Sequence, residues 1–186
     1  MTYSDSQMLA IWRRALGFEA ALADASVERT DGIDLDAWLR HRMRQWYLHC
    51  LDTAPLEKLV LTDVAADASA LLGPDPHNTV SGSVTPDQGW RRIVSVRLFG
   101  WHRPAEPLEG PDGRAALERM ACRFTAPSVQ DPVAVLTPGR LIVAPVVRPL
   151  VESLLVVADT GPDIYSLHES LLKTIPSQLD FDEQRY

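Results

Sequence analysis

Residues 82–104, GSVTPDQGWRRIVSVRLFGWHRP, decide the fold of the second half of the chain. A run of β-forming residues lies between a Pro-Asp turn signal and a Gly-Trp exit. The run alternates, so that Val94, Val96 and Leu98 share one side of a strand. The stretch also holds two of the five tryptophans and four of the sixteen arginines. This pattern predicts a strand against which other parts of the molecule pack, rather than a reaction site.

The first third of the chain has helical periodicity instead. Apolar residues recur at three- and four-residue spacing from Gln7 to about Leu22. Ser4 or Asp5 is the expected N-cap, and Gly17 is a weak point inside this helix. A first helix over these residues is therefore predicted.

A second helix is predicted after a break at residues 30–32, with Asp34 as its N-cap and its end at residues 53–55. One face is mainly apolar and carries Leu35, Trp38, Leu39, Arg42, Met43, Trp46 and Cys50. The opposite face carries Asp36, Arg40, Arg44 and Gln45. The two helices together predict a helical hairpin with aromatic anchors.

The middle of the chain changes from helical to β patterning. Residues 56–61, LEKLVL, fit either a strand or a helix, whereas DVAADASALL (63–72) favours a helix. Residues 73–78, GPDPHN, predict a loop and the boundary between domains. Whether residues 56–72 as a whole are helix or strand stays open at this point.

Four further elements are predicted beyond residue 104. These are a short helix from Arg114 to Cys122, a hairpin in PVAVLTPGRLIVAPVV (132–147) that turns at Pro138-Gly139, a strand in VESLLVVAD (151–159), and a short helix from Tyr165 to Thr174. Pro145 has no N–H to donate, so it belongs at an edge or a bulge.

These elements predict an α+β fold: an N-terminal helical hairpin or bundle with an inserted antiparallel β-subdomain, followed by a short C-terminal helix and an extended tail. The expected parts are a helical region at 1–72, an antiparallel β-subdomain at 79–159, a C-terminal helix at 160–175 and an extended tail at 176–186. The chain of 186 residues is long enough for one core with a projecting subdomain.

Composition narrows the classes of function. The net charge of −7 argues against a protein that grips nucleic acid over its whole surface. No apolar run approaches the ~20 residues of a membrane span, and the N-terminus lacks a signal-peptide pattern, so neither membrane insertion nor secretion is expected. Two distant cysteines make no disulfide framework and fall short of a structural zinc site. We expect no cofactor and no metal.

Two short patterns resemble catalytic motifs. Asp159-Thr160-Gly161 follows the apolar run LLVVA, as in the active-site turn of aspartic proteases, which would require a homodimer to supply a second aspartate. A strand that ends in a turn explains the same residues. Ser170 and Lys173 match a serine-lysine dyad by spacing, but a solvated helix face explains them better. We therefore predict no enzyme, with Asp159 as the one catalytic alternative.

Two basic aromatic clusters are candidate binding surfaces. The first, on the second helix, comprises Arg40, His41, Arg42 and Arg44 with Trp38 and Trp46. The second, on the strand, comprises Arg91, Arg92, Arg97, His102 and Arg103 with Trp90, Phe99 and Trp101. Such clusters suit single-stranded nucleic acid, with the stretch Trp90–Arg103 as the binding strand, and they equally suit protein interfaces. The negative net charge favours protein partners.

Residues 84–96, VTPDQGWRRIVSV, resemble the entry into the central β-strand of the head-to-tail connector proteins of short-tailed bacteriophages, of the adaptor or tail tubular protein A type. The resemblance therefore implies that this strand is the central one of the β-subdomain. Residues 100–104, GWHRP, are similar to the exit from that strand. The helical segments LAIWRRALG and WYLHCLDTAP and the hairpin PVAVLTPGRLIVAP also fit. Thr85 replaces the usual leucine, the aromatic Trp90 comes one residue late, and the C-terminal helix is short.

This resemblance implies a structural virion protein that is made in the host cytoplasm. It implies a twelvefold ring of this chain that docks under the portal protein, extends the DNA channel and carries the downstream tail component. Packaged DNA would pass through the ring without sequence-specific binding. The implied protein-interface residues are Trp12, Trp38, Trp46, Trp90, Arg92, Arg97, Trp101, Arg103, Leu179, Phe181 and Tyr186.

Overall fold

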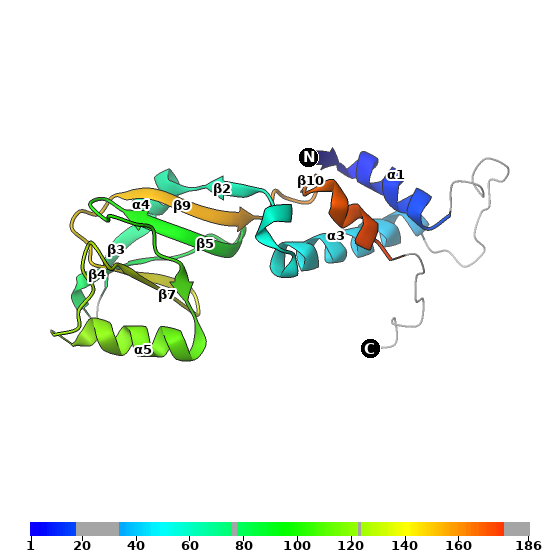
Figure 1. Cartoon of the computed structure of the whole chain (residues 1–186). Helices are drawn as coiled ribbons and strands as arrows, with labels where there is room; N and C mark the ends of the chain where they lie inside the picture. The colour runs from blue at the N-terminus through cyan, green and yellow to red at the C-terminus, as the bar shows by residue number, and fades with distance from the viewer. Residues whose placement is uncertain (18–33, 76–77, 123, 177–186) are drawn as a thin grey trace. The chain divides into compact units, whose positions relative to one another are not determined.

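The computed structural model describes residues 1–17, 34–75, 78–122 and 124–176 (Figure 1). It has the predicted α+β fold, with helices and mainly antiparallel sheets. The chain divides into two compact units. The helical unit consists of Met1–Val60 and Asp159–Tyr186, and the β unit consists of Leu61–Ala158.

Helix α1 spans Asp5–Ala15 and begins at a capping box. The Ser4 hydroxyl accepts the Gln7 N–H at 3.3 Å, and the Gln7 side chain accepts the Ser4 N–H at 2.9 Å. Gly17 was expected inside the helix, but it follows the helix end with φ of +75°. That left-handed conformation ends a helix and costs glycine little. The rest of the predicted helix, to Leu22, lies outside the described residues.

Helix α3 spans Leu35–Thr53, close to the prediction, and Asp34 caps it through the N–H groups of Asp36 and Ala37. Its buried face is turned relative to the expected one. The central buried residue is Tyr47, whereas Trp38 and Trp46 stay partly exposed. The buried side chains of α3 are Leu39, Met43, Tyr47, Cys50 and Leu51.

The ring of Trp12 in α1 meets the ring of Trp46 edge-to-face, with centroids 5.8 Å apart. This contact packs α1 against α3 within the helical unit. A single 3₁₀ turn, η1 (Leu56–Lys58), follows α3.

The predicted C-terminal helix at 160–175 is shorter than expected, because residues 164–166 form a strand and the helix covers only Glu169–Thr174. Strand β10 (Ile164–Ser166) pairs antiparallel with β1 (Thr2–Ser4), and only a 3₁₀ helix, η2 (Glu169–Thr174), follows it. The cause is tertiary, because the partner strand lies at the other end of the chain and local periodicity cannot reveal it. Tyr165 of β10 is buried, and its ring packs edge-to-face on the ring of Tyr47, with centroids 5.0 Å apart.

The β unit contains two sheets around a shared core (Figure 1). Three strands form the order β2-β9-β5, with bounds Leu61–Asp63, Val151–Ala158 and Trp90–Leu98. Five strands form the order β3-β4-β8-β7-β6, with bounds Leu72–Asp75, Asn78–Val84, Arg140–Ala144, Val133–Thr137 and Pro107–Leu108. Helix α4 (Ala65–Leu71) contributes the buried Ala68 to the shared core, and α5 (Gly110–Ala121) covers the other face of the five-stranded sheet.

Strand β7 shows how these layers fit together. Ala134 faces the core shared with the three-stranded sheet, while Val133 and Val135 face Ala116 and Met120 of α5. A strand buried on both faces is apolar, as the buried residues Val133–Val135 of β7 are. The predicted hairpin β7–β8 is confirmed, and Gly139 takes its turn with φ of +77°.

Two further expectations about the β unit are corrected. The predicted boundary loop at 73–78 overlaps β3, which pairs with β4, and the two units divide instead at 60/61 and 158/159. Helix α4 therefore belongs to the β unit. The strand Trp90–Leu98 was expected to be central, but β9 lies between β2 and β5, so β5 is an edge strand of its sheet.

Trp101 holds one end of the shared core. Its side chain is 1% exposed, and the indole N–H donates to the Pro145 carbonyl at 2.7 Å. This bond ties the segment after β5 to the segment after β8. Trp101 is therefore a core residue of the chain.

Replacing Trp101 with phenylalanine removes this donor and leaves the Pro145 carbonyl without it. We expect the Trp101→Phe substitution to lower the free energy of unfolding by roughly 1–3 kcal/mol, measured by urea denaturation followed by circular dichroism. Trp12→Phe is the matched control, since Trp12 is also 1% exposed and its indole N–H has no hydrogen-bond partner among the described residues. An equal loss from both substitutions would contradict a role for the hydrogen bond.

Candidate interaction sites

The basic aromatic strand does not form a row of free rings and cations. Trp101 is buried, and Trp90 packs partly against the shared core. Arg97 pairs with Glu152 at 3.1 Å, and Arg103 pairs with Asp131. Arg92 is half-buried. A stacking platform for single-stranded nucleic acid needs accessible rings beside accessible cations, and this arrangement offers few of either.

The basic aromatic helix is also engaged within its own unit. Arg40 donates to Asp5 of α1 at 2.8 Å. The Arg42 guanidinium lies 5.6 Å from the centroid of the Trp38 ring. Arg44 points back into the unit and pairs with Asp159. Arg40 and Arg44 therefore tie α3 to other parts of the helical unit, whereas the Arg42 contact lies within α3.

The remaining interface candidates divide into two groups. Trp12 is buried, whereas Trp38 and Trp46 are partly exposed. Leu179, Phe181 and Tyr186 lie outside the described residues. Among the described residues of the predicted set, Trp12 and Trp101 are therefore core residues rather than surface residues of their own units.

Asp159, the one catalytic candidate, lies in a turn in which both carboxylate oxygens have partners. Oδ1 accepts the Gly161 N–H at 3.1 Å, and Oδ2 pairs with Arg44. Arg44 also donates to the Gly161 carbonyl at 2.8 Å, and Gly161 has φ of +98°. The aspartate thus shapes the turn between β9 and β10. This geometry explains the Asp-Thr-Gly sequence as a structural turn.

The same turn is joined to α3 by a buried phenol. The Tyr47 hydroxyl accepts the Ser166 N–H at 3.1 Å, and Thr160 donates to the Ile164 carbonyl at 2.7 Å. Burial raises the pKa of the neighbouring Tyr165 to about 12, so its phenol stays neutral. These hydrogen bonds hold the turn and β10 against α3 within the helical unit.

The Asp159→Asn substitution keeps an acceptor for Gly161 and removes the charge that Arg44 pairs with. We expect it to lower the free energy of unfolding by roughly 1–3 kcal/mol in urea denaturation, because both partners are mostly buried. Asp163→Asn is the control on the same turn, since no ion pair of Asp163 is present among the described residues. A loss of similar size from the control would contradict this role for Arg44.

Sequence reasoning missed a second charged network in the β unit. Asp131 bridges Arg103 and Arg119, and Arg119 also donates to the Thr125 carbonyl at 3.0 Å. Hydrogen bonds from Arg119 and Arg103 hold the pKa of Asp131 below its usual range. The three residues lie far apart in the sequence, and their pairing depends on how α5 packs on the sheet. The network holds the loop between α5 and β7.

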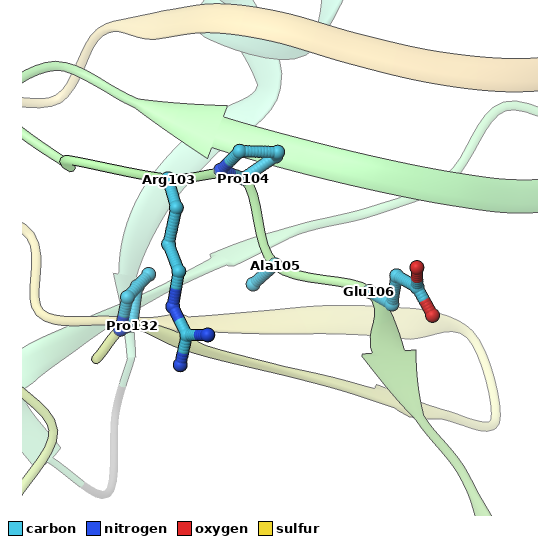
Figure 2. Close-up of a pocket in the computed structure, with 5 residues that line it drawn as sticks. All are labelled: Arg103, Pro104, Ala105, Glu106 and Pro132. Atoms are coloured by element: carbon cyan, nitrogen blue, oxygen red, sulfur yellow. The ribbon is translucent and has the colours of Figure 1, made fainter. Parts of the chain in front are cut away.

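A small pocket lies beside this network (Figure 2). It has a volume of about 240 Å³ and is lined by Arg103, Pro104, Ala105, Glu106 and Pro132. In Figure 2 the Arg103 side chain extends toward Pro132, whereas Glu106 points away from it. Typical small-molecule sites are larger, at roughly 300–1,000 Å³, and bring several polar groups together. The pocket has neither property.

The Asp131 network predicts a specific dependence of stability on pH. A lowered pKa in the folded state stabilises the fold above about pH 4, the ordinary value for an unfolded aspartate. This contribution is lost as pH falls through the folded-state pKa. We expect the difference in urea midpoint between the native chain and Asp131→Asn to be small and constant from pH 5 to 7 and to shrink below pH 4. A difference that persists in acid would contradict the charge-based account.

Cys50 and Cys122 are both free thiols. Cys50 is buried, and this burial raises its pKa to about 11. Cys122 is exposed, and hydrogen bonds from Thr125 and from backbone N–H groups lower its pKa. Within the described ranges, no group of three or more His, Cys, Asp or Glu side chains is arranged to hold a metal ion. No helix of this part of the chain has the length and apolar character to cross a membrane.

Comparison with known proteins adds no relative: no protein-family model matches the chain, and no curated protein matches it.

Proposed function

We propose that this chain is a structural virion protein, a head-to-tail connector of the adaptor type. In this role copies of the chain form a ring under the portal protein. The ring extends the DNA channel and provides the attachment platform for the downstream tail component. The protein acts by assembly and not by catalysis.

The observation that carries the proposal is the way in which the β unit is inserted into the helical unit. Residues 61–158 form one compact unit, and the segments before and after it close into another through β1 and β10. The connector resemblance implies this combination, with a helical part for ring contacts and a projecting β part. The resemblance was carried by the strand at 90–98, by its flanking turns and by the helices.

The distribution of charge is consistent with the same role. The helical unit contains fifteen acidic and nine basic residues, whereas the β unit contains ten and nine. Tight phosphate contacts would release counterions and hold DNA in place. An acidic ring avoids such contacts and lets DNA slide.

Assembly with the portal protein of the same genome tests this proposal. We expect the full chain, mixed with purified portal rings, to add a closed ring of mass close to twelve chains, seen by mass photometry and by negative-stain images. A monomer in the absence of portal is compatible, because assembly on the portal is the prediction. An acidic protein of similar size controls for non-specific association. A chain that stays monomeric with the portal present would overturn the proposal.

A further inference from the structure

One end of the β unit carries an apolar surface. Strand β5 ends where β9 begins, since Leu98 pairs with Val151, while the chain enters and leaves the unit at the opposite end, where Leu61 pairs with Val157 (Figure 1). The segment after β8 crosses the first of these ends. The Val146 N–H donates to the Val80 carbonyl at 2.9 Å. The Phe99 N–H donates to the Leu150 carbonyl, also at 2.9 Å.

We name this feature the end surface and define it by Val80, Phe99, Val147, Arg148 and Leu150. Val80, Val147 and Leu150 are 48%, 57% and 46% exposed. Gly100 has no side chain, and a Cβ atom at that position would lie 3.9 Å from a methyl group of Val147. The backbone hydrogen bonds from Val146 to Val80 and from Phe99 to Leu150 hold in place the segments that carry these apolar side chains. Such ordered apolar groups on a surface are typical of protein interfaces.

Arg148 gives the end surface its charge. Its guanidinium lies 4.9 Å from the centroid of the Phe99 ring, and it makes no ion pair with any residue in the described ranges. The other arginines discussed above, by contrast, mostly pair with carboxylates inside their own unit. A cation stacked on a ring among apolar groups is best matched by a partner that presents a carboxylate beside an apolar side chain.

The helical unit has that combination at the turn before β10. Ile164 is 44% exposed, and the exposed Asp163 precedes it. The Asp163 side chain makes no ion pair with the described residues. Its backbone carbonyl accepts the Asp5 N–H at 3.0 Å, so the turn is held in place.

We propose that the end surface of one copy packs on residues 162–164 of a second copy, where Arg148 pairs with Asp163 and the apolar groups cover Ile164. The contact joins two different surfaces, so it is heterologous and can close into a ring. The proposal rests on the proposed connector function for ring closure, but the contact between copies is a separate claim.

Charge exchange tests the contact on the full chain, with ring assembly on portal measured by mass photometry as a function of chain concentration. We expect Arg148→Asp and Asp163→Arg each to raise the concentration needed for assembly about tenfold or more, as charge pairs at interfaces do. We expect the double variant to restore assembly, because positions 148 and 163 again carry opposite charges after the exchange. Arg140→Asp, an exposed charge reversal on the β7–β8 turn, is the matched control and leaves assembly unchanged.

Mixing the two single variants shows whether the pair forms between copies. When the Arg148→Asp chain alternates with the Asp163→Arg chain, every contact again joins opposite charges. We therefore expect the equimolar mixture to assemble in an even-numbered ring at a chain concentration at which neither variant assembles alone. A pair within one copy would not be rescued by mixing.

Three results would overturn this contact. If the native chain forms rings and both single variants form them equally well, the end surface is not the contact between copies, and the connector function stands. If rings form but Arg148→Asp loses another virion protein instead, the surface belongs to that partner. If the native chain never assembles, the connector function and this contact fail together.

Discussion

The antiparallel pairing of Thr2–Ser4 with Ile164–Ser166 is the constraint on which the rest of the structure depends. It brings the two ends of the chain together and thereby makes residues 61–158 an insertion. The pairing is supported by α3, because the Tyr47 hydroxyl accepts the Ser166 N–H and the Tyr47 ring packs on Tyr165. A three-residue ladder is weak alone. Buried aromatic packing and the Arg44–Asp159 pair give it stability.

Several arginines in the described part of the chain pair with carboxylates of their own unit. Arg40 and Arg44 fasten α3 to α1 and to the turn before β10, while Arg103 and Arg119 share Asp131 in the β unit. A guanidinium that already pairs with a carboxylate contributes less to the free energy of binding a ligand, because the new contact must replace an existing one. For this reason the candidate interface residue is Arg148, which no sequence pattern indicated, and not an arginine of the two basic aromatic clusters. Arg148 pairs with no carboxylate of the described residues, and its guanidinium stacks on the Phe99 ring.

The site residues were harder to predict than the fold. Trp101 lies in a run of aromatic and basic residues that is typical of binding, yet its ring completes the shared core and its N–H bonds to Pro145. Asp159 matches a catalytic triplet, yet its carboxylate is divided between Gly161 and Arg44. In both cases the residue type suits two roles. The deciding factor is a partner more than forty residues away.

Local signals in the sequence by themselves determined the α+β class, the caps at Ser4 and Asp34, the hairpin around Gly139 and the strands at 90–98 and 151–158. Caps, turns and alternation act over a few residues, so they can be read along the chain. Only the tertiary structure decided that β9 and not β5 is central, that residues 164–166 form a strand, and which arginines are paired. These features depend on contacts between distant segments, whose free energy exists only once the chain has packed.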